Sequence, residues 1–137
     1  AGAVGLMQRA LDLSLAYAGE RKQFGKPIAQ FQLVQEHLAA MKLDLEAARL
    51  LTYRAAWKKV KGEPYTLEAS LAKLFASEAA NRVAYRAIQV HGGYGFFEEY
   101  EVARLYRDAR ILTLYEGTSE VQKLIIGAHL TGVRAFA

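Results

Sequence analysis

The sequence predicts an all-α domain, namely an up-and-down four-helix-type bundle with a short fifth helix. Hydrophobic residues make up 53% of the 137 residues, and strong helix formers such as Ala, Leu, Glu and Arg dominate. Only two prolines occur, Pro27 and Pro64, and both fall in connections between predicted helices. Because those connections are short, consecutive helices should run antiparallel, as they do in an up-and-down bundle.

The first two predicted helices are recognised by their apolar spacing. The first covers about residues 3–18, and its wide apolar face is formed by Val4, Met7, Leu11 and Leu15. The second runs from about residue 28 to residue 61 and should be on the order of 50 Å long. Lysines in its last turn suit a helix C-terminus, and Gly62 followed by Pro64 prevents its continuation.

The third predicted helix is rich in alanine. It is expected to begin at Thr66, whose hydroxyl suits an N-cap, and to end before Gly92 and Gly93. Its small residues indicate that another helix approaches it closely. The fourth helix should start at Glu98 or Glu99 and reach residue 112. The fifth helix should follow residue 116 and end at residue 132.

The composition excludes several classes of site. The chain has no cysteine, so disulfides, thiol nucleophiles and thiolate metal sites are excluded. This composition is compatible with a reducing compartment, and we expect a cytoplasmic location. No apolar stretch approaches the length that crosses a bilayer, and no N-terminal segment has the order of a signal peptide. We therefore expect no membrane span.

The charge is mildly basic. The net charge of +4 comes from 18 basic and 14 acidic residues. It describes either an ordinary basic surface or a protein that binds an anionic ligand such as phosphate. The basic residues are interspersed with carboxylates and form no strip interleaved with aromatic residues, so the pattern disfavours nucleic acid as a partner.

Two of the three glycine-containing breaks have the residues to bind an anion. In Arg21-Lys22-Gln23-Phe24-Gly25, the cations either complement the dipole of the preceding helix or clamp a phosphate, for which Arg21 offers paired donors. In Gln89-Val90-His91-Gly92-Gly93, the glycines either stop a helix or let a diphosphate lie against the backbone. His91 has no second ligand at helical spacing, so we expect no metal site.

The third break places one carboxylate, Glu116, before Gly117, Thr118 and Ser119. Glu116 is explained either by the favourable dipole of the next helix or by a role as a general base. Apolar neighbours would desolvate its carboxylate, and Gly117 would let a ligand approach the backbone. Thr118 or Ser119 would cap the last helix. We expect the bundle to bring the three breaks to one end.

Taken together, these stretches resemble the C-terminal domain of flavin-dependent acyl-CoA dehydrogenases. Their order, spacing and helical context agree with that family from the first residue to the last. The matching stretches are Arg21-Lys22-Gln23-Phe24-Gly25-Lys26-Pro27-Ile28 with Phe31-Gln32, Gln89 to Gly95, Arg107-Asp108-Ala109-Arg110-Ile111, and Tyr115-Glu116-Gly117-Thr118-Ser119-Glu120.

The resemblance implies a reaction and an assembly. It implies a bundle within a homotetramer, a dimer of dimers, in which FAD lies between this domain, a middle β domain and a neighbouring subunit. A carboxylate removes the α-proton of an acyl-CoA thioester, and the β-hydrogen leaves as hydride to the flavin. The product is a trans-2-enoyl-CoA, as in fatty acid metabolism, and the electrons pass on to electron-transferring flavoprotein.

The resemblance also implies roles for individual residues. Glu116 corresponds to the catalytic base, and Gly117 corresponds to a substrate contact. The residues implied to bind FAD are Arg21, Gln23, Phe24, Gln32, Gln89, Val90, His91, Gly92, Gly93, Thr118 and Glu120. Within this set, Arg21, Gln23, Phe24 and Gln32 would hold the FAD of the adjacent subunit.

Members of that family are much longer and carry an N-terminal helical domain and a β domain ahead of this one. We therefore expect residues 1–137 to be the C-terminal helical bundle domain alone, with the N-terminal and middle domains absent. Such a fragment should have no dehydrogenase activity and should bind FAD weakly or not at all. Two alternatives remain. One is a helical bundle that serves only oligomerisation, and the other is an acyl-CoA oxidase, in which oxygen reaches the reduced flavin.

Overall fold

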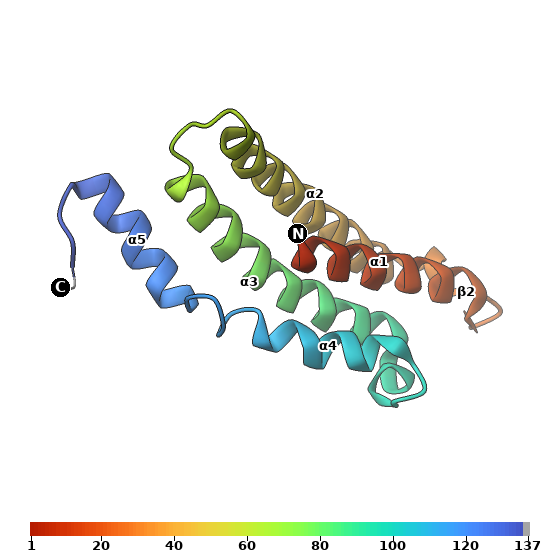
Figure 1. Cartoon of the computed structure of the whole chain (residues 1–137). Helices are drawn as coiled ribbons and strands as arrows, with labels where there is room; N and C mark the ends of the chain where they lie inside the picture. Colours follow the sequence, from red (N-terminus) through yellow and green to blue (C-terminus); the bar gives the residue numbers. More distant parts are fainter. Residues whose placement is uncertain (136–137) are drawn as a thin grey trace.

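The computed structural model describes residues 1–135, which are almost entirely helical (Figure 1). The α-helices are α1 (Gly2–Glu20), α2 (Gln32–Val60), α3 (Thr66–His91), α4 (Glu101–Ile111) and α5 (Ser119–Thr131). The connections add a hairpin of β1 (Lys22–Gln23) and β2 (Lys26–Pro27), and the 3-10 turns η1 (Ile28–Gln30) and η2 (Gly92–Phe96). The predicted all-α class is confirmed.

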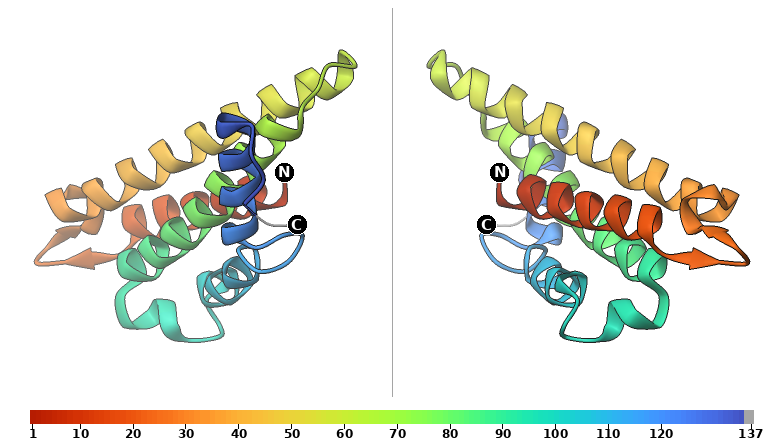
Figure 2. Two further views of the ribbon diagram at one scale, coloured as in Figure 1. Left: turned by 90° about the vertical axis from the view of Figure 1, so that its left-hand side faces the viewer. Right: turned by 90° about the vertical axis from the view of Figure 1, so that its right-hand side faces the viewer.

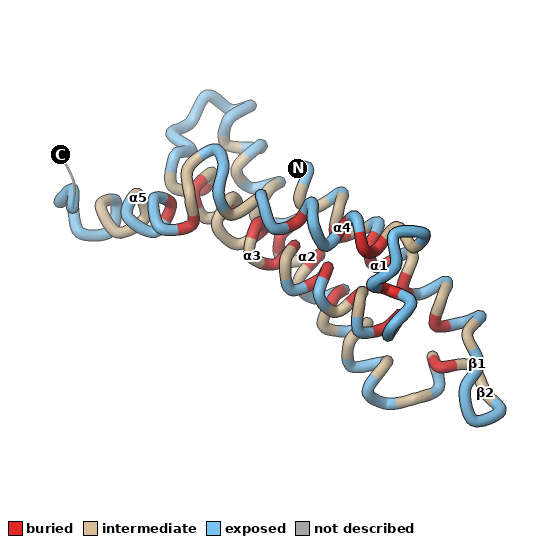
Figure 3. Tube along the Cα trace, turned by 90° about the horizontal axis from the view of Figure 1, so that it is seen from below, coloured by how far each residue is buried: buried red, intermediate tan, exposed pale blue. Residues whose placement is uncertain are grey.

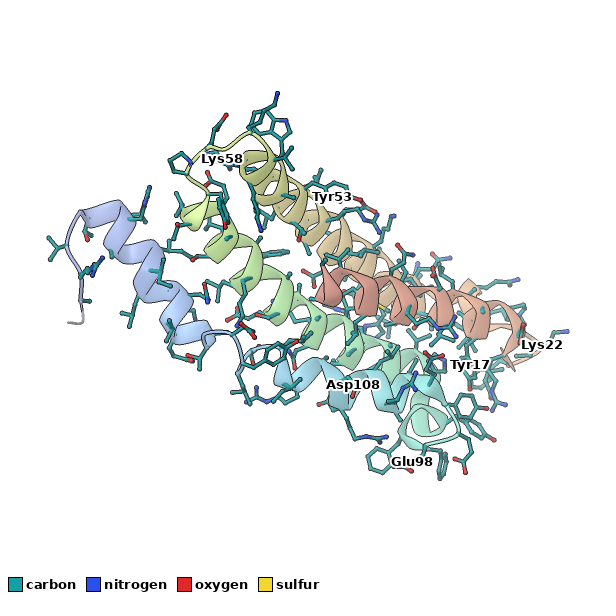
Figure 4. The ribbon with its side chains drawn as sticks, in the orientation of Figure 1. Tyr17, Lys22, Tyr53, Lys58, Glu98 and Asp108 are labelled. Atoms are coloured by element: carbon teal, nitrogen blue, oxygen red, sulfur yellow. The ribbon has the colours of Figure 1, made fainter. Side chains whose placement is uncertain are left out.

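Helices α1 to α4 alternate in direction, and α3 contacts each of the other four α-helices. Helix α5 leaves the bundle after α4 and crosses the first half of α3 at an angle (Figure 2). The α1–α2 connection and the α3–α4 connection lie at one end of the bundle, where Tyr17 and Lys22 are found. Lys58 lies at the other end (Figure 4).

The core sits where α1 to α4 meet, whereas α5 is largely exposed (Figure 3). The largest fully buried apolar side chains of the core are Met7, Met41, Leu45, Val83 and Val102. Burying a side chain of this size stabilises the fold by about 1.5–3 kcal/mol relative to leaving it in water. These residues come from all four bundle helices, so the core requires the four to pack together.

Helix α3 contributes mainly small side chains to this core. Its buried alanines are Ala72, Ala76, Ala79, Ala80, Ala84 and Ala87. Small side chains let the backbones of neighbouring helices approach, which confirms the expectation drawn from the alanine-rich sequence.

Ion pairs also connect the helices. Arg9 on α1 bonds Glu101 on α4 at 2.6 Å, and Lys58 on α2 bonds the buried Glu68 on α3 at 2.8 Å.

Two predicted helix starts and one predicted N-cap are wrong. Residues 28–30 form a 3-10 turn, and Phe31 is extended, so α2 begins at Gln32. Helix α3 begins at Thr66 as predicted, but the Thr66 side chain makes no capping bond, because Tyr65 occupies the N-cap position. The fourth helix begins at Glu101, after a bend, and not at Glu98 or Glu99.

Leu15, predicted on the buried face of the first helix, is 51% exposed. The helix ends predicted at Gly62, Gly92 and Gly132 are confirmed to within two residues. Among the residues that the structure describes, no helix combines the length and the apolar character needed to span a bilayer.

Candidate functional site

The first candidate site lies where the C-terminal ends of α1 and α3 meet. A cavity of about 640 Å³ opens there. Its lining residues are Tyr17, Arg21, Gln23, Ile28, Gln89, Val90, His91, Gly92, Gly93, Tyr94 and Phe97. Seven predicted FAD-binding residues are thus brought together around one cavity, from two stretches that lie far apart in the sequence.

The wall of this cavity is aromatic and carries one fixed cation. The rings of Tyr17 and His91 stack with centroids 4.2 Å apart, and the Tyr17 hydroxyl donates to the His91 carbonyl oxygen at 3.4 Å. The Arg21 guanidinium lies 5.2 Å from the centre of the Tyr94 ring. Sequence reasoning missed Tyr17 and Tyr94. The spacing in the sequence could have indicated Tyr17, since it lies one helical turn before Arg21 and therefore on the same side of the helix end.

His91 is a structural part of this wall. It is buried, and its Nδ1–H donates to the Ala87 carbonyl oxygen at 2.8 Å. Burial lowers the pKa of His91 below its ordinary value, and the bond to Ala87 only partly opposes this effect. The imidazole is therefore neutral at pH 7 and adds no charge to the cavity. Residues 1–135 contain no cluster of His, Cys, Asp or Glu able to hold a metal ion.

Four predicted FAD-binding residues lie outside the cavity lining; Thr118 and Glu120 follow the Glu116 turn, and Phe24 and Gln32 lie nearer the hairpin. Phe24 is 93% exposed at the tip of the β1–β2 hairpin, and Gln32 is exposed at the first turn of α2. Phe24 and Gly25 have φ values of +52° and +79°, as a two-residue hairpin turn with both central residues left-handed requires. Such a φ is unfavourable for a bulky residue. The turn therefore exposes the aromatic ring of Phe24 to solvent, and the backbone of Phe24 is strained.

The second candidate site is the turn between α4 and α5. Glu116 has a φ of +57° and Gly117 a φ of +84°, so two successive residues of this turn are left-handed. A non-glycine residue in this region is uncommon, and such strain clusters at functional sites. Glu116 also lines a second cavity, of about 330 Å³, together with Lys73, Leu112 and Tyr115.

The start of α5 is capped as predicted. The Thr118 hydroxyl accepts a hydrogen bond from the Val121 N–H at 3.3 Å. Glu120 follows in the first turn, and a backbone N–H bond together with the Thr118 hydroxyl lowers the pKa of its carboxyl. The carboxylate of Glu116 is exposed, and Leu114 and Tyr115 are themselves 48% and 47% exposed. The expected desolvation of Glu116 by its neighbours in this chain is therefore wrong.

Lys73 and Gln122 hold this turn, and sequence reasoning missed both. The Lys73 ammonium donates to the Gly117 carbonyl oxygen at 2.5 Å. The Gln122 amide nitrogen lies 3.4 Å from the Glu116 carbonyl oxygen and 3.3 Å from that of Gly117. The Lys73 contact has no local sequence signal, because Lys73 lies 44 residues before Gly117. Gln122 lies only five residues after Gly117, so its place in the first turn of the last helix could have indicated it.

The two candidate sites lie apart within one copy of the chain. Lys73, which contacts the Glu116 turn, and Gln89, which lines the first cavity, are both on α3. The 16 residues between them span about 24 Å of helix at 1.5 Å per residue. Figure 1 shows the α4–α5 turn and the β1–β2 hairpin well separated along the bundle. The expectation that all three breaks meet at one end is wrong, because α4 carries the chain back along the bundle before Glu116.

Comparison with known proteins decides the family. Residues 1–131 match the family model described as the acyl-CoA dehydrogenase C-terminal domain. The chain belongs to the acyl-CoA dehydrogenase family. A probable acyl-CoA dehydrogenase of Bacillus subtilis, YngJ, is 53% identical to this acyl-CoA dehydrogenase domain over 128 residues, which cover 93% of the chain and 34% of the relative.

Solved structures show the same fold. Butyryl-CoA dehydrogenase from Megasphaera elsdenii superposes with a TM-score of 0.92 at 49% identity, over 93% of this chain and 33% of that one. A FAD complex of PigA superposes with a TM-score of 0.90 at 38% identity, over 93% and 33% of the two chains. The acyl-CoA dehydrogenase domain thus spans about a third of the length of the relatives it matches.

Proposed function

We propose that this domain supplies the catalytic base and part of the flavin site of a full-length, FAD-dependent acyl-CoA dehydrogenase. The enzyme converts an acyl-CoA thioester to a trans-2-enoyl-CoA. The observation that carries the proposal is the Glu116-Gly117 turn, where an exposed carboxylate sits on left-handed backbone beside a cavity. A bundle that serves only assembly needs neither a strained glutamate nor a glycine after it.

Glu116 acts as the base that removes the α-proton. A thioester α-proton is a very weak acid, so its removal has to coincide with departure of the β-hydrogen and with polarisation of the thioester carbonyl. The chemistry that bound FAD would supply is an acceptor for that β-hydrogen as hydride. Gly117 lets the substrate approach the backbone next to the base. Since Glu116 is exposed in this domain, we expect other parts of the full-length enzyme to exclude water from it.

The first cavity fits the adenosine and diphosphate part of FAD. Arg21 supplies a cation for the diphosphate, and its contact with Tyr94 fixes where that cation stands. Gly92 and Gly93 have no side chain to keep a phosphate from the backbone. Gln23 and Gln89 add amide donors, while Val90 and the neutral His91 present apolar and aromatic surface. The donors and the shape therefore suit a nucleotide with a diphosphate.

The remaining proposed FAD contacts belong to other parts of the surface. Thr118 and Glu120 lie just after the base, Phe24 lies in the turn of the β1–β2 hairpin, and Gln32 is the first residue of α2. Lys73 at the Glu116 turn and Gln89 at the cavity are separated by about 24 Å of helix α3, so one copy does not present all of these residues to one flavin reaction centre. We propose that the cavity of one subunit and the Glu116 turn of another complete each site.

This arrangement requires a homo-oligomer, and the surface of α2 supports association. The large apolar side chains that α2 exposes are Leu33, Leu43, Leu50, Tyr53, Trp57 and Val60. An apolar stripe of this size on a helix face is typical of a surface covered by a partner. We propose a homotetramer built as a dimer of dimers, with electron-transferring flavoprotein as the electron acceptor. The cytoplasmic location stays a prediction.

Flavin bleaching by acyl-CoA thioesters tests the proposed function. Full-length, FAD-loaded enzyme is mixed with acyl-CoAs that differ in chain length and branching, with and without oxygen. Bleaching that persists in air and is reversed by electron-transferring flavoprotein supports a dehydrogenase. Rapid reoxidation of the flavin by oxygen identifies an oxidase. If no thioester bleaches the flavin, the proposed function fails and the alternative of a bundle that serves only oligomerisation is favoured. The isolated residues 1–137 should lose FAD during gel filtration, so stoichiometric FAD retained on that fragment contradicts the shared-site proposal.

A further inference from the structure

The turn that carries Glu116 needs external contacts to keep its shape. Left-handed backbone is sterically unfavourable for glutamate, so in isolation Glu116 would relax toward a negative φ and its carboxylate would move. Gly117 follows with a positive φ as well. No regular secondary structure spans residues 112–118 in the described chain. The position of the carboxylate therefore depends on what holds the two peptide groups beside it.

Two side chains hold the peptide that follows Gly117, and one of them also contacts the peptide that follows Glu116. The Lys73 ammonium donates to the Gly117 carbonyl oxygen at 2.5 Å, and the Gln122 amide lies 3.3 Å from the same oxygen. The same Gln122 nitrogen is 3.4 Å from the Glu116 carbonyl oxygen. Lys73 comes from α3 and Gln122 from α5, so the turn is tied to both helices that flank it.

The glycine is part of this arrangement. A Cβ added to Gly117 would lie 2.7 Å from the Gln122 amide nitrogen. Any side chain at residue 117 would therefore push Gln122 away from the carbonyls that it holds. Gln122 itself is only 7% exposed, so it has little room to move aside. The packing thus links residue 117 to the position of the peptide groups around Glu116.

Lys73 differs from an ordinary surface lysine in its surroundings. It is the only lysine of α3, it is half-buried, and it lines the same 330 Å³ cavity as Glu116. The other α3 residues of that cavity are Ala69, Ala72, Ala76 and Ser77. The lysine has no carboxylate partner among the described ion pairs, and its short hydrogen bond goes to the turn. A charged donor on a rigid helix is well suited to fix a carbonyl.

We infer that Lys73 is a positioning residue for the base. It fixes the Gly117 carbonyl, and through that peptide it holds the Glu116 carboxylate where it meets the substrate α-carbon. Gln122 assists on the same oxygen. The inference rests on the proposed function, since it assigns a role toward the reaction of Glu116. Lys73 itself neither touches the reacting atoms nor transfers a proton.

Lys73→Met in the full-length, FAD-loaded enzyme tests this role. Methionine keeps most of the stem but removes the donor, so kcat should fall at least about tenfold while KM and FAD content stay within twofold. Abstraction of the α-proton should become more rate-limiting, so the isotope effect with substrate deuterated at the α-carbon should rise. Lys73→Arg keeps a charged donor and should recover most of kcat. Lys123→Met is the matched control, because Lys123 pairs with Glu78 and has no recorded contact with the turn.

The isotope effect separates positioning from a structural role. If kcat of Lys73→Met stays within twofold of the wild type, or falls only in proportion to FAD content with an unchanged isotope effect, the inference is overturned. Gln122→Met gives the same test if Lys73→Met does not fold, with a smaller drop in kcat and the same rise in isotope effect. Glu116→Gln is measured alongside. If Glu116→Gln stays active, the proposed function itself fails; if it is inactive and Lys73→Met is normal, only the role of Lys73 fails.

Discussion

The rings of Tyr17 and His91 stack with centroids 4.2 Å apart and planes 25° from parallel. This contact joins the last turn of α1 to the last turn of α3, at the wall of the first cavity. It also encloses the imidazole, which is buried. The stability of this end of the bundle is therefore linked to the protonation state of His91.

Lowering the pH should destabilise the domain through His91. Burial lowers the pKa of His91 below its ordinary value of 6.5, so the unfolded chain binds this proton more readily than the folded one. The stability that neutral His91 contributes is complete above the ordinary pKa and is lost as the pH falls below it. Between pH 7.5 and 5.5, thermal unfolding of the wild type should shift to lower temperature more than that of His91→Gln. Equal shifts in the two proteins would contradict this linkage.

Gly95→Ala should destabilise the same end of the bundle. An added Cβ would lie 2.9 Å from the His91 Cβ and 3.0 Å from the Ile88 carbonyl oxygen. Such overpacking costs about 1–3 kcal/mol of the free energy of unfolding. Gly127→Ala is the matched control within α5, where an added Cβ meets nothing within 4 Å, and it should stabilise the helix by about 0.5–1 kcal/mol. Urea unfolding of the two variants measures both changes, and a neutral Gly95→Ala would show that η2 is free to move.

Arg21→Met should weaken FAD binding in the full-length enzyme. Loss of a charged hydrogen-bond donor costs about 1.5–3 kcal/mol, which corresponds to a rise in the FAD dissociation constant of roughly ten- to hundredfold. Lys22→Met serves as the control, because Lys22 is the neighbouring cation but does not line the cavity. Flavin fluorescence during titration measures both constants. If the FAD dissociation constant rises equally in the two variants, the effect comes from the loss of one positive charge near the site and not from a specific contact of Arg21.

Thr118→Ala should destabilise α5 by removing its N-cap. The Thr118 hydroxyl accepts from the Val121 N–H, and loss of such a cap costs about 0.5–2 kcal/mol of the free energy of unfolding. Thr118→Ser retains the hydroxyl and should behave like the wild type. Chemical denaturation followed by circular dichroism compares the three proteins. An unchanged midpoint for Thr118→Ala would mean that the packing of α5 on α3 does not depend on the cap.

The fold and the family were predictable from local patterns in the sequence. Apolar spacing indicated each helix, and glycine and proline marked their ends. Boundaries failed where tertiary contacts decide them: Phe31 is extended and packs near Ile28, so α2 begins four residues later than its periodicity predicts. Thr66 has a hydroxyl suited to capping but lies one residue too far into α3 to use it.

The site was predictable only in part, because side chains meet across the bundle. Arg21 and Gln89 were identified by their motifs, and the structure brings them to one cavity. Lys73 was not identified, because its contact with Gly117 joins helix α3 to a distant turn. The separation of the Glu116 turn from the first cavity also escaped prediction. It follows from the direction of α4, which a list of motifs does not contain.

The central claim is that Glu116 removes the α-proton. The direct measurement is the rate at which a saturating acyl-CoA bleaches the flavin of full-length Glu116→Gln enzyme, compared with the wild type at equal FAD occupancy. Glutamine keeps the size of the side chain and removes the base, so bleaching should slow by about 10²–10⁴-fold while FAD stays bound. Bleaching at a near-normal rate would contradict the assignment of Glu116 as the base.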